Sequence, residues 1–138
     1  MASVYTHIIA GDLPARFVWK DDVAVAFTDI NPISNGHTLV VPRAEVDHWL
    51  DLEPAVAGHC MQVAQTVGQA IMAAFTPRRV GMIIAGFDVP HTHLHVLPVH
   101  GMGDLDFGKA RNPGDEALDA AARAIRAALA DLGHPYHE

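Results

Sequence analysis

The sequence predicts an α+β fold, a five-stranded antiparallel sheet with two main helices packed against one of its sides. The first observation behind this prediction is a set of five short segments, rich in β-branched and aromatic residues and separated by turn residues. The second is a pair of long segments in which apolar side chains recur every three or four residues. The order along the chain, three strands, a helix, two strands and a helix, is typical of such an antiparallel layout.

The first part of the chain is expected to form a short helix and three strands. Residues 3–10 predict a helix that Gly11 closes. The acidic pair at 21–22 predicts a tight turn between two hairpin strands, and 29–35 has the composition of a longer turn. Pro42 ends the third strand. The expected strands cover 17–20, 23–27 and 36–41.

The second part is expected to contain the two long helices and two neighbouring strands, over 80–85 and 90–98. Asp51 is the expected N-cap of the first long helix, and Asn112-Pro113 is expected to cap the second, which Gly133 closes. The buried stripe of the first helix is expected at Val56, Cys60, Val63, Val67, Ile71 and Phe75. That of the second is expected at Leu118, Ala122, Ile125, Leu129 and Leu132.

Composition limits the possible partners. The 138 residues suffice for one domain, over 1–138, with a core of its own. A net charge of -7 argues against a nucleic acid or an anionic membrane as the main partner, because both require a basic surface. The single cysteine, Cys60, excludes an intrachain disulfide and a cysteine-rich zinc site. We therefore expect a cytoplasmic location, and the N-terminus has no basic flank of a signal peptide.

The most informative segment is Pro90 to Pro98, in which His91, His93 and His95 occupy every second position. In an extended strand these three side chains would leave on one face, with Thr92, Leu94 and Val96 on the other. Neighbours in such a row lie roughly 6.5 to 7 Å apart, so one bound phosphate could contact two of them.

Two chemistries fit this row of histidines. In one, a neutral imidazole attacks an electrophile such as phosphorus while its neighbours supply protons and hold the developing charge. In the other, the row and a further histidine bind a transition metal. A solvated strand face or packed histidines would be the ordinary interpretation of a single histidine, but not of three at this spacing.

The segment His91 to Leu97 resembles the His-x-His-x-His-x-x signature, with apolar x, of the histidine triad nucleotide hydrolases and transferases. A second match is Phe27-Thr28-Asp29-Ile30-Asn31-Pro32, followed by Gly36-His37-Thr38-Leu39-Val40-Val41-Pro42. The resemblance covers about residues 8–99. It implies a single histidine triad domain over 1–138 that dimerises, so that two five-stranded sheets become one ten-stranded sheet.

The resemblance also implies a role for each of four histidines. His93 matches the nucleophile that attacks the α-phosphorus and becomes a nucleotidyl-histidine before water releases the monophosphate. His91 matches the residue whose backbone carbonyl holds the proton of that nucleophile. His95 matches the histidine that contacts the phosphate, and His37 matches a fourth histidine that helps with the leaving group or with orientation.

The implied substrate is a small-molecule nucleotide. Asp29 would bind the ribose hydroxyls, because a carboxylate can accept from two vicinal OH groups; without the resemblance, Asp-Ile-Asn-Pro would be interpreted as an Asx turn. An apolar slot for the base is expected from Ile8, Leu13, Phe27 and Ile30. The implied activity is that of a nucleoside phosphoramidase or nucleotide hydrolase, which cleaves a phosphoramidate or phosphoanhydride bond at the α-phosphate, with a purine as the expected base.

Two departures from the family pattern lie near the chemistry. Gly86 aligns with a Gly-Gln-Ser/Thr segment, but Phe87 and Asp88 follow it, and the usual asparagine before the triad is missing. An ionised Asp88 would repel a phosphate. Either its side chain points elsewhere, or the leaving-group preference differs from that of the commonest members.

The second departure concerns zinc. Some members bind structural zinc through a Cys-x-x-Cys pair, but Ser3 and Thr6 occupy those positions and Glu45 replaces a histidine. We expect no such site and no required cofactor. Zinc could still bind some of the other candidate ligands, which are His37, His48, His91, His93 and His95.

Two alternative functions stay open, a metal-dependent enzyme built on the histidine cluster and a non-catalytic nucleotide-binding regulator. Metal removal would stop only the first. Covalent labelling of His93 by the nucleotide would argue against the second.

A homodimer is also predicted from the long helix over 51–75. Residues 54–77 contain no Asp, Glu, Lys or Arg, which is unusual for a helix with one face in water. The helix is therefore expected to lie in the dimer interface, where its small residues, Ala57, Gly58, Ala64 and Gly68, would admit a partner backbone. A membrane span is discounted because His59 and several glutamines interrupt the apolar run.

Overall fold

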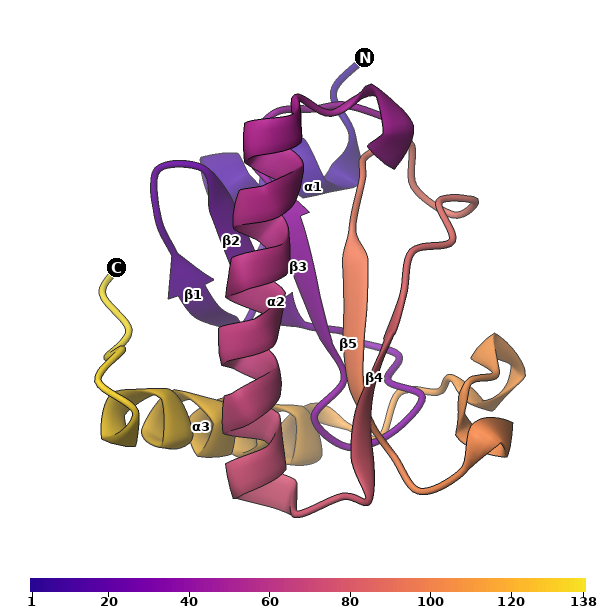
Figure 1. The fold of residues 1–138 in the computed structure, drawn as a ribbon, viewed down its shortest axis with the longest axis vertical. Coiled ribbons are helices and arrows are strands. Elements are labelled where there is room, and N and C mark those ends of the chain that lie inside the picture. Colours follow the sequence, from indigo (N-terminus) through magenta and orange to yellow (C-terminus); the bar gives the residue numbers. More distant parts are fainter.

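The computed structural model describes all 138 residues and contains a five-stranded antiparallel sheet of order β1-β2-β3-β5-β4 (Figure 1). Every neighbouring pair of strands is antiparallel. The predicted α+β class is therefore confirmed. The strands are β1 (Phe17–Lys20), β2 (Ala24–Thr28), β3 (Thr38–Pro42), β4 (Arg79–Ile83) and β5 (Leu94–Val99).

Three α-helices accompany the sheet, and they are α1 (Val4–Ala10), α2 (Pro54–Phe75) and α3 (Asp115–Asp131). Figure 1 shows α2 running across one face of the sheet, with α3 crossing below it on that same side. The short α1 lies on the opposite face, so only the two long helices follow the expected one-sided arrangement. None of the helices combines the length and the apolar character needed to cross a membrane.

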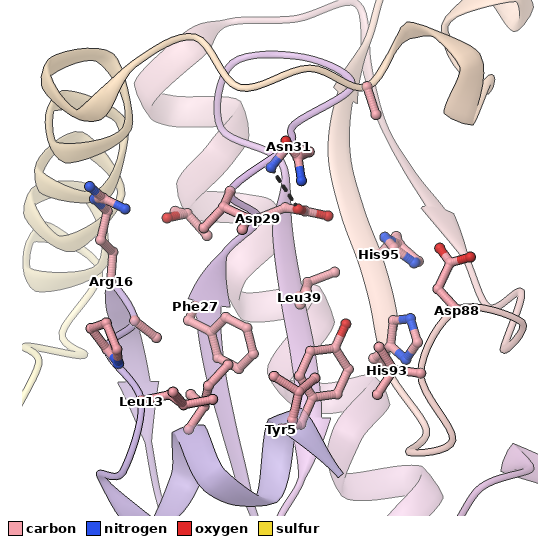
Figure 2. A pocket seen from close by; sticks show the side chains of 18 of the residues that line it. Tyr5, Leu13, Arg16, Phe27, Asp29, Asn31, Leu39, Asp88, His93 and His95 are labelled. Carbon is pink, nitrogen blue, oxygen red and sulfur yellow. Dashed lines mark hydrogen bonds between the residues drawn. The ribbon is translucent and has the colours of Figure 1, made fainter.

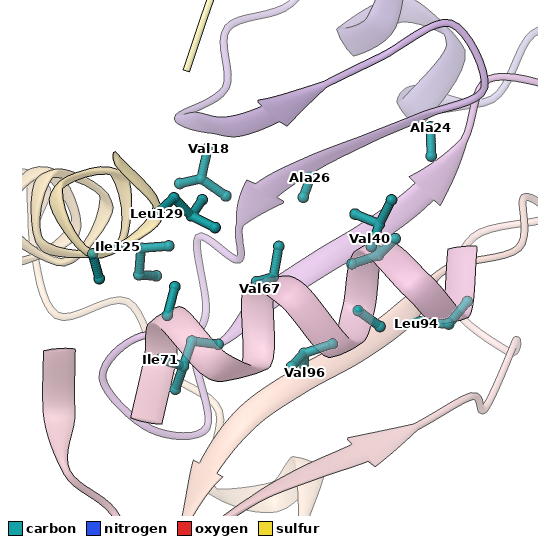
Figure 3. Close-up of a cluster of buried hydrophobic side chains, with 14 of the residues drawn as sticks. Val18, Ala24, Ala26, Val40, Val67, Ile71, Leu94, Val96, Ile125 and Leu129 are labelled. Carbon is teal, nitrogen blue, oxygen red and sulfur yellow. The ribbon is translucent and has the colours of Figure 1, made fainter. Parts of the chain in front are cut away.

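The strands alternate their side chains between two apolar clusters, as a period of two requires. Ala26 of β2, Val40 of β3 and Val96 of β5 point toward α2 and α3, in the main core of Figure 3. Phe27 and Leu39, one residue away, point to the other face and pack with Tyr5 of α1. The α2 face of the sheet is therefore solid core, and the α1 face is the one left free to form a site.

The histidine segment departs from the expected strand. β5 begins only at Leu94, so His95 is the one triad histidine within it, and Pro98 lies inside the strand opposite Val80. The predicted row of three histidines on one strand is therefore wrong. The cause is a distant contact: the backbone N–H of Thr92 donates to the carbonyl of Val46 at 2.8 Å, in the connection between β3 and α2, instead of to a sheet neighbour.

Both expected helix caps are also wrong. Asp51 lies in a short 3₁₀ turn, and α2 begins at Pro54, where proline fixes the backbone without needing an N–H partner. The N-cap of α3 is Gly114. Asn112 instead shapes the preceding turn, because its side-chain oxygen accepts from the N–H of Gly114 at 2.7 Å.

Two of the four small residues of α2 do not face outward as expected. Ala64 and Gly68 are buried, and a methyl group on Gly68 would lie 3.5 Å from Cγ1 of Val80. This side of α2 packs on its own sheet, so the prediction that these two residues admit a partner is wrong. The exposed face of α2 carries other uncharged residues, Gly58, Met61, Gln62, Gln65, Gln69, Met72 and Ala73.

The turn between β1 and β2 is held by the carboxylate of Asp21. One oxygen accepts from the N–H groups of Val23 and Ala24 at 2.8 Å, and the other accepts from the Trp19 indole at 2.8 Å and the His59 ring at 2.6 Å. Partial burial alone would raise the pKa of Asp21, but these hydrogen bonds, led by that from Trp19, lower it to about 2.

Asp21 should make the protein sensitive to acid. Because the folded-state pKa lies below the ordinary value of 3.8, the stabilisation is complete above about pH 4 and is lost as pH falls toward 2. The gap in unfolding free energy between wild type and Asp21→Asn should shrink by roughly 2 kcal/mol between pH 5 and pH 2. Denaturant titrations at several pH values measure this gap. The exposed neighbour Asp22→Asn is the control, and an equal pH dependence in both variants would contradict the prediction.

Candidate active site

A cavity of about 1040 Å³ opens on the α1 face of the sheet. Figure 2 shows His93 and His95 on one side of it, Phe27 and Tyr5 at its base, and Asp29 above Phe27 with its carboxylate toward His95. The cavity therefore places two triad histidines and an apolar surface on the same side of the sheet.

The apolar end of the cavity contains the slot expected from the sequence. Ile8, Leu13, Phe27 and Ile30 all line it. Leu13 and Ile30 are 41 % and 57 % exposed, so their apolar side chains face open space and are not part of a packed core. The structure brings together all four residues that the sequence singled out for this slot.

Sequence reasoning missed Tyr5, which forms another wall of the slot. Its ring lies edge-on to Phe27 at 5.6 Å and to His93 at 5.0 Å between centroids. The signal was present, because Tyr5 lies three residues before Ile8 and so on the same face of a helix. The buried hydroxyl of Thr28, also missed, lines the cavity and has no hydrogen-bond partner within the protein.

Asp29 both forms the Asx turn and lines the cavity, so the two interpretations of its motif are compatible. One carboxylate oxygen accepts from the N–H of Asn31 at 2.9 Å, which is the Asx turn expected from Asp-Ile-Asn-Pro. The other lies 3.7 Å from Nε2 of His37, and the side chain lines the cavity. Burial raises the pKa of Asp29. The turn fixes the carboxylate and leaves its second oxygen at the cavity.

The hydrogen-bond partners assign the tautomers of His37 and His95. The N–H of Ile33 donates to Nδ1 of His37 at 3.0 Å, so the proton of a neutral His37 ring is on Nε2. That Nε2–H donates to Nδ1 of His95 at 2.9 Å. The proton of His95 is consequently on Nε2, which has no protein partner. Burial, together with neighbouring histidines, lowers the pKa of His37 to about 3 and that of His95 to about 4, so both rings are neutral at pH 7.

His93 has the opposite tautomer. Its Nδ1 lies 2.7 Å from the backbone carbonyl of His91, and because a carbonyl can only accept, Nδ1 carries the proton. Nε2 of the neutral ring is then unprotonated. The rings of His93 and His95 are 4.9 Å apart between centroids and both line the cavity. The cavity therefore holds a bare imidazole nitrogen next to an imidazole N–H donor.

Of the four histidines with a predicted catalytic role, His37 and His91 do not line the cavity. His37 is buried behind His95, to which it donates, and His91 lies before the start of β5. The ring of His91 is fully buried, with Nε2 2.8 Å from the carbonyl of Pro42 and Nδ1 2.7 Å from the hydroxyl of Ser3. Both ring nitrogens are thus held by the protein. Its backbone carbonyl, but not its side chain, reaches His93.

The family model described as HIT domain matches residues 10–102. The chain belongs to the HIT family. An uncharacterized HIT-like protein of Mycobacterium tuberculosis is 33 % identical over 139 residues, which is 94 % of each chain. Adenylylsulfatase HINT3 of Arabidopsis thaliana is 27 % identical over 100 residues, covering 69 % of this chain and 51 % of the plant protein.

Solved structures of HIT proteins share the fold. The crystal structure of a zinc-bound histidine triad family protein from Mycobacterium smegmatis superposes with a TM-score of 0.84 at 29 % identity and covers 96 % of both chains. The expected histidine triad fold is therefore confirmed.

Compared with the HIT pattern, Asp88 is the departure with the clearest consequence. Its side chain lines the cavity beside His93 and His95, and in Figure 2 its carboxylate lies next to these rings. The alternative that it points elsewhere is therefore excluded. Four carboxylates line the cavity, those of Asp29, Asp88, Asp115 and Asp119. The only basic residue there, Arg16, already pairs with Asp119 at 2.6 Å and Asp115 at 3.2 Å.

The HIT zinc site that uses two cysteines has no counterpart in this chain. Ser3, Thr6 and Glu45 hydrogen-bond one another, and they offer no thiolate. Both nitrogens of His91 are also occupied. These residues do not fit a resident zinc ion.

A second group, Asp29, His37 and His95, has donor atoms within 4.8 Å of one another. A metal there would need an unprotonated Nε2 on His37, but the N–H of Ile33 occupies Nδ1 and leaves the proton on Nε2. The hydrogen bonds of this group therefore oppose metal binding. His48 is exposed and caps a 3₁₀ turn, outside the main cavity.

Proposed function

We propose that the chain is a nucleotide hydrolase or transferase that cleaves a phosphoramidate or phosphoanhydride bond at the α-phosphate through a nucleotidyl-histidine intermediate on His93. The observation that carries this proposal is the unprotonated Nε2 of His93 in the cavity, beside the free Nε2–H of His95. A nucleophile and a donor for phosphoryl oxygens are the two parts that such a transfer needs most.

The nucleotide would bind along the length of the cavity. The base would enter the slot formed by Ile8, Leu13, Phe27 and Ile30, next to the Tyr5 ring. The free oxygen of Asp29 would accept from the ribose hydroxyls, because Asp29 lies above Phe27 with its carboxylate toward His95. The α-phosphate would then lie against His93 and His95.

In the first step, Nε2 of His93 would attack phosphorus, and the bond to the leaving group would break as that group takes the electron pair and a proton from solvent. The new N–P bond makes the His93 ring cationic, and the Nδ1–H donates to the His91 carbonyl at 2.7 Å, which stabilises this charge. Nε2–H of His95 would donate to a phosphoryl oxygen. In the second step, water would attack phosphorus and give up a proton to solvent. The N–P bond would break with its electron pair returning to Nε2 of His93, and the monophosphate would be released.

Incubation with adenosine phosphoramidate, diadenosine polyphosphates and adenosine phosphosulfate, with and without a chelator, tests this function through AMP release. We expect release in both conditions, since no step uses a metal. Loss of release with the chelator would favour the metal-dependent enzyme, and nucleotide binding without any release would favour the regulator. The name of the Arabidopsis relative, adenylylsulfatase, is consistent with an adenylyl substrate.

The charge of the cavity predicts a substrate preference. Four carboxylates and one paired arginine should disfavour a leaving group with several negative charges, so we expect higher kcat/KM for adenosine phosphoramidate than for diadenosine tetraphosphate. Asp88→Asn should raise kcat/KM for the tetraphosphate about tenfold and change that for the phosphoramidate far less. Asp22→Asn, on the exposed hairpin turn, is the matched control. An equal change for both substrates would contradict this charge effect.

We also propose a homodimer through the exposed face of α2 and the free edge of β4. β4 pairs only with β5, so its other edge can pair with a second copy and extend the sheet to ten strands. Met61, Met72 and Met82 are 53 %, 38 % and 40 % exposed, and α2 carries no charged side chain that a partner would have to desolvate.

The dimer should dissociate when charge is added to this surface. Light scattering of the wild type at micromolar concentration should give about twice the chain mass of 14.8 kDa. Met61→Glu should give the monomer mass, because a carboxylate would be buried without a partner. Ala127→Glu, on the exposed side of α3, should stay dimeric. A wild type of monomer mass would contradict the proposal.

A further inference from the structure

The backbone that carries His93 is not held by the sheet. The ladder between β3 and β5 ends at the pair Val40 and Leu94, one residue after His93. The residues before Leu94 are held by other contacts, chiefly the bonds of Thr92 to the Val46 carbonyl and the two side-chain bonds of His91. The position of the His93 ring therefore depends on how His91 is anchored.

The two bonds of His91 have a defined direction. Nε2 faces the Pro42 carbonyl at 2.8 Å, so Nε2 carries the proton. Nδ1 of the neutral ring must then accept, and the hydroxyl of Ser3 at 2.7 Å is its donor. Burial lowers the pKa of His91, which favours this neutral form.

The surroundings of Ser3 leave its proton free for this bond. Ser3 is 6 % exposed and is the N-cap of α1, where its Oγ accepts from the N–H of Thr6 at 3.0 Å. The hydroxyl of Thr6 donates to Glu45 at 2.6 Å, and Glu45 also accepts from the N–H of Ser3 at 2.6 Å. Two acceptors lie within reach of the Ser3 hydroxyl, Oγ1 of Thr6 at 3.3 Å and Nδ1 of His91 at 2.7 Å. Nδ1 of His91 is the closer one and has no other donor, so it accepts the hydrogen bond of the Ser3 hydroxyl.

We infer that Ser3 is a positioning residue for the nucleophile: its hydroxyl anchors the His91 ring, and the His91 carbonyl in turn aligns His93. This inference rests on the proposed function of His93. The chain of contacts runs from the start of α1 through His91 to Nδ1 of His93 at 2.7 Å. Because α1 also supplies Tyr5 and Ile8 to the cavity, one short helix fixes both a wall of the base slot and the reacting nitrogen.

Loss of the Ser3 hydroxyl should affect turnover more than binding. Ser3→Gly removes the hydroxyl but keeps most of the N-cap preference, since glycine at this position costs a helix little. We expect kcat to fall about tenfold with KM within about twofold, because small errors in alignment act mainly on the transition state. Ser3→Thr, which restores a hydroxyl, should recover kcat.

The imidazole signals of the histidines in a ¹H–¹⁵N spectrum distinguish this positioning role from a purely structural one. In wild type we expect a protonated Nε2 and a hydrogen-bonded Nδ1 on His91, and a slowly exchanging Nδ1–H on His93. In Ser3→Gly, Nδ1 of His91 should lose its hydrogen-bond shift and the His93 proton should exchange faster, while Ser3→Thr should resemble wild type. Thr66→Ala, whose hydroxyl bonds only within α2, is the matched control.

The outcomes separate the inference from the function on which it rests. Unchanged His93 exchange and unchanged kcat in Ser3→Gly would overturn the inference. Altered imidazole signals in a protein whose wild type releases no AMP would uphold the anchoring but overturn the proposed function. Should Ser3→Gly not fold, Ser3→Cys serves instead, because a thiol is a much weaker hydrogen-bond donor to Nδ1 of His91 than a hydroxyl.

Discussion

Replacing His93 with alanine should lower kcat for AMP release by a factor on the order of 10³ or more, because it removes the nucleophile itself. Nucleotide affinity should stay within a few-fold, since the lost interaction is made mainly on the way to the transition state. Single-turnover kinetics with adenosine phosphoramidate and a separate binding titration measure the two quantities. His95→Ala and His37→Ala should slow turnover less severely.

His100→Ala is the control for this experiment, because His100 is exposed and lies outside the cavity. Normal turnover in His93→Ala would overturn the proposed mechanism. Mass spectrometry of the trapped intermediate gives an independent answer, since the nucleotidyl group should be found on His93. A nucleotidyl group on His91 would contradict the tautomer assignment, in which both nitrogens of that ring are engaged.

Gly36→Ala should lower the free energy of unfolding by about 3 kcal/mol. Gly36 has φ +104°, a conformation that costs an alanine roughly 1 to 2 kcal/mol. A methyl group there would also lie 2.5 Å from Cε2 of Phe75, and such overpacking costs typically 1 to 3 kcal/mol. Denaturant unfolding monitored by circular dichroism measures the loss.

Gly133→Ala separates the two contributions to this loss. Gly133 has φ +91° but open space around its α carbon, so only the backbone strain applies. We expect it to lose less than half as much stability as Gly36→Ala. Equal losses in the two variants would mean that the Phe75 ring moves aside at no cost, and the steric part of the prediction would be wrong.

The spacing of apolar residues predicted the main helices and strands. Each of them buries one face, and the residues of that face recur at a spacing that is visible within a short stretch of sequence. The buried residues of α2 and α3 repeat at helical spacing, and Leu94 and Val96 point into the core as the period of two required. The limits of the elements were less predictable. The starts of α2 and α3 were not predictable from capping residues, because neither helix begins with a side-chain cap: α2 begins at Pro54 after Glu53, and α3 begins after Gly114.

The place of Asp29 and of the four apolar slot residues around the cavity was predictable, because each was matched to a position of the family pattern. Their roles in binding stay predictions. The place of His91 was not predictable, because it depends on Ser3 and Pro42, which are 88 and 49 positions away along the chain. The tautomers of the histidines were equally beyond the sequence. They follow from partners such as the N–H of Ile33, whose position only the folded backbone defines.

Three of the histidine rings take their proton placement from main-chain groups, the N–H of Ile33 and the carbonyls of Pro42 and His91. Ordinary side-chain substitutions leave these groups in place. A lineage can therefore exchange residues around the cavity, as at Asp88, without changing which nitrogen is free to react. Such a site is open to evolutionary drift in its choice of substrate while its reacting atoms stay constant.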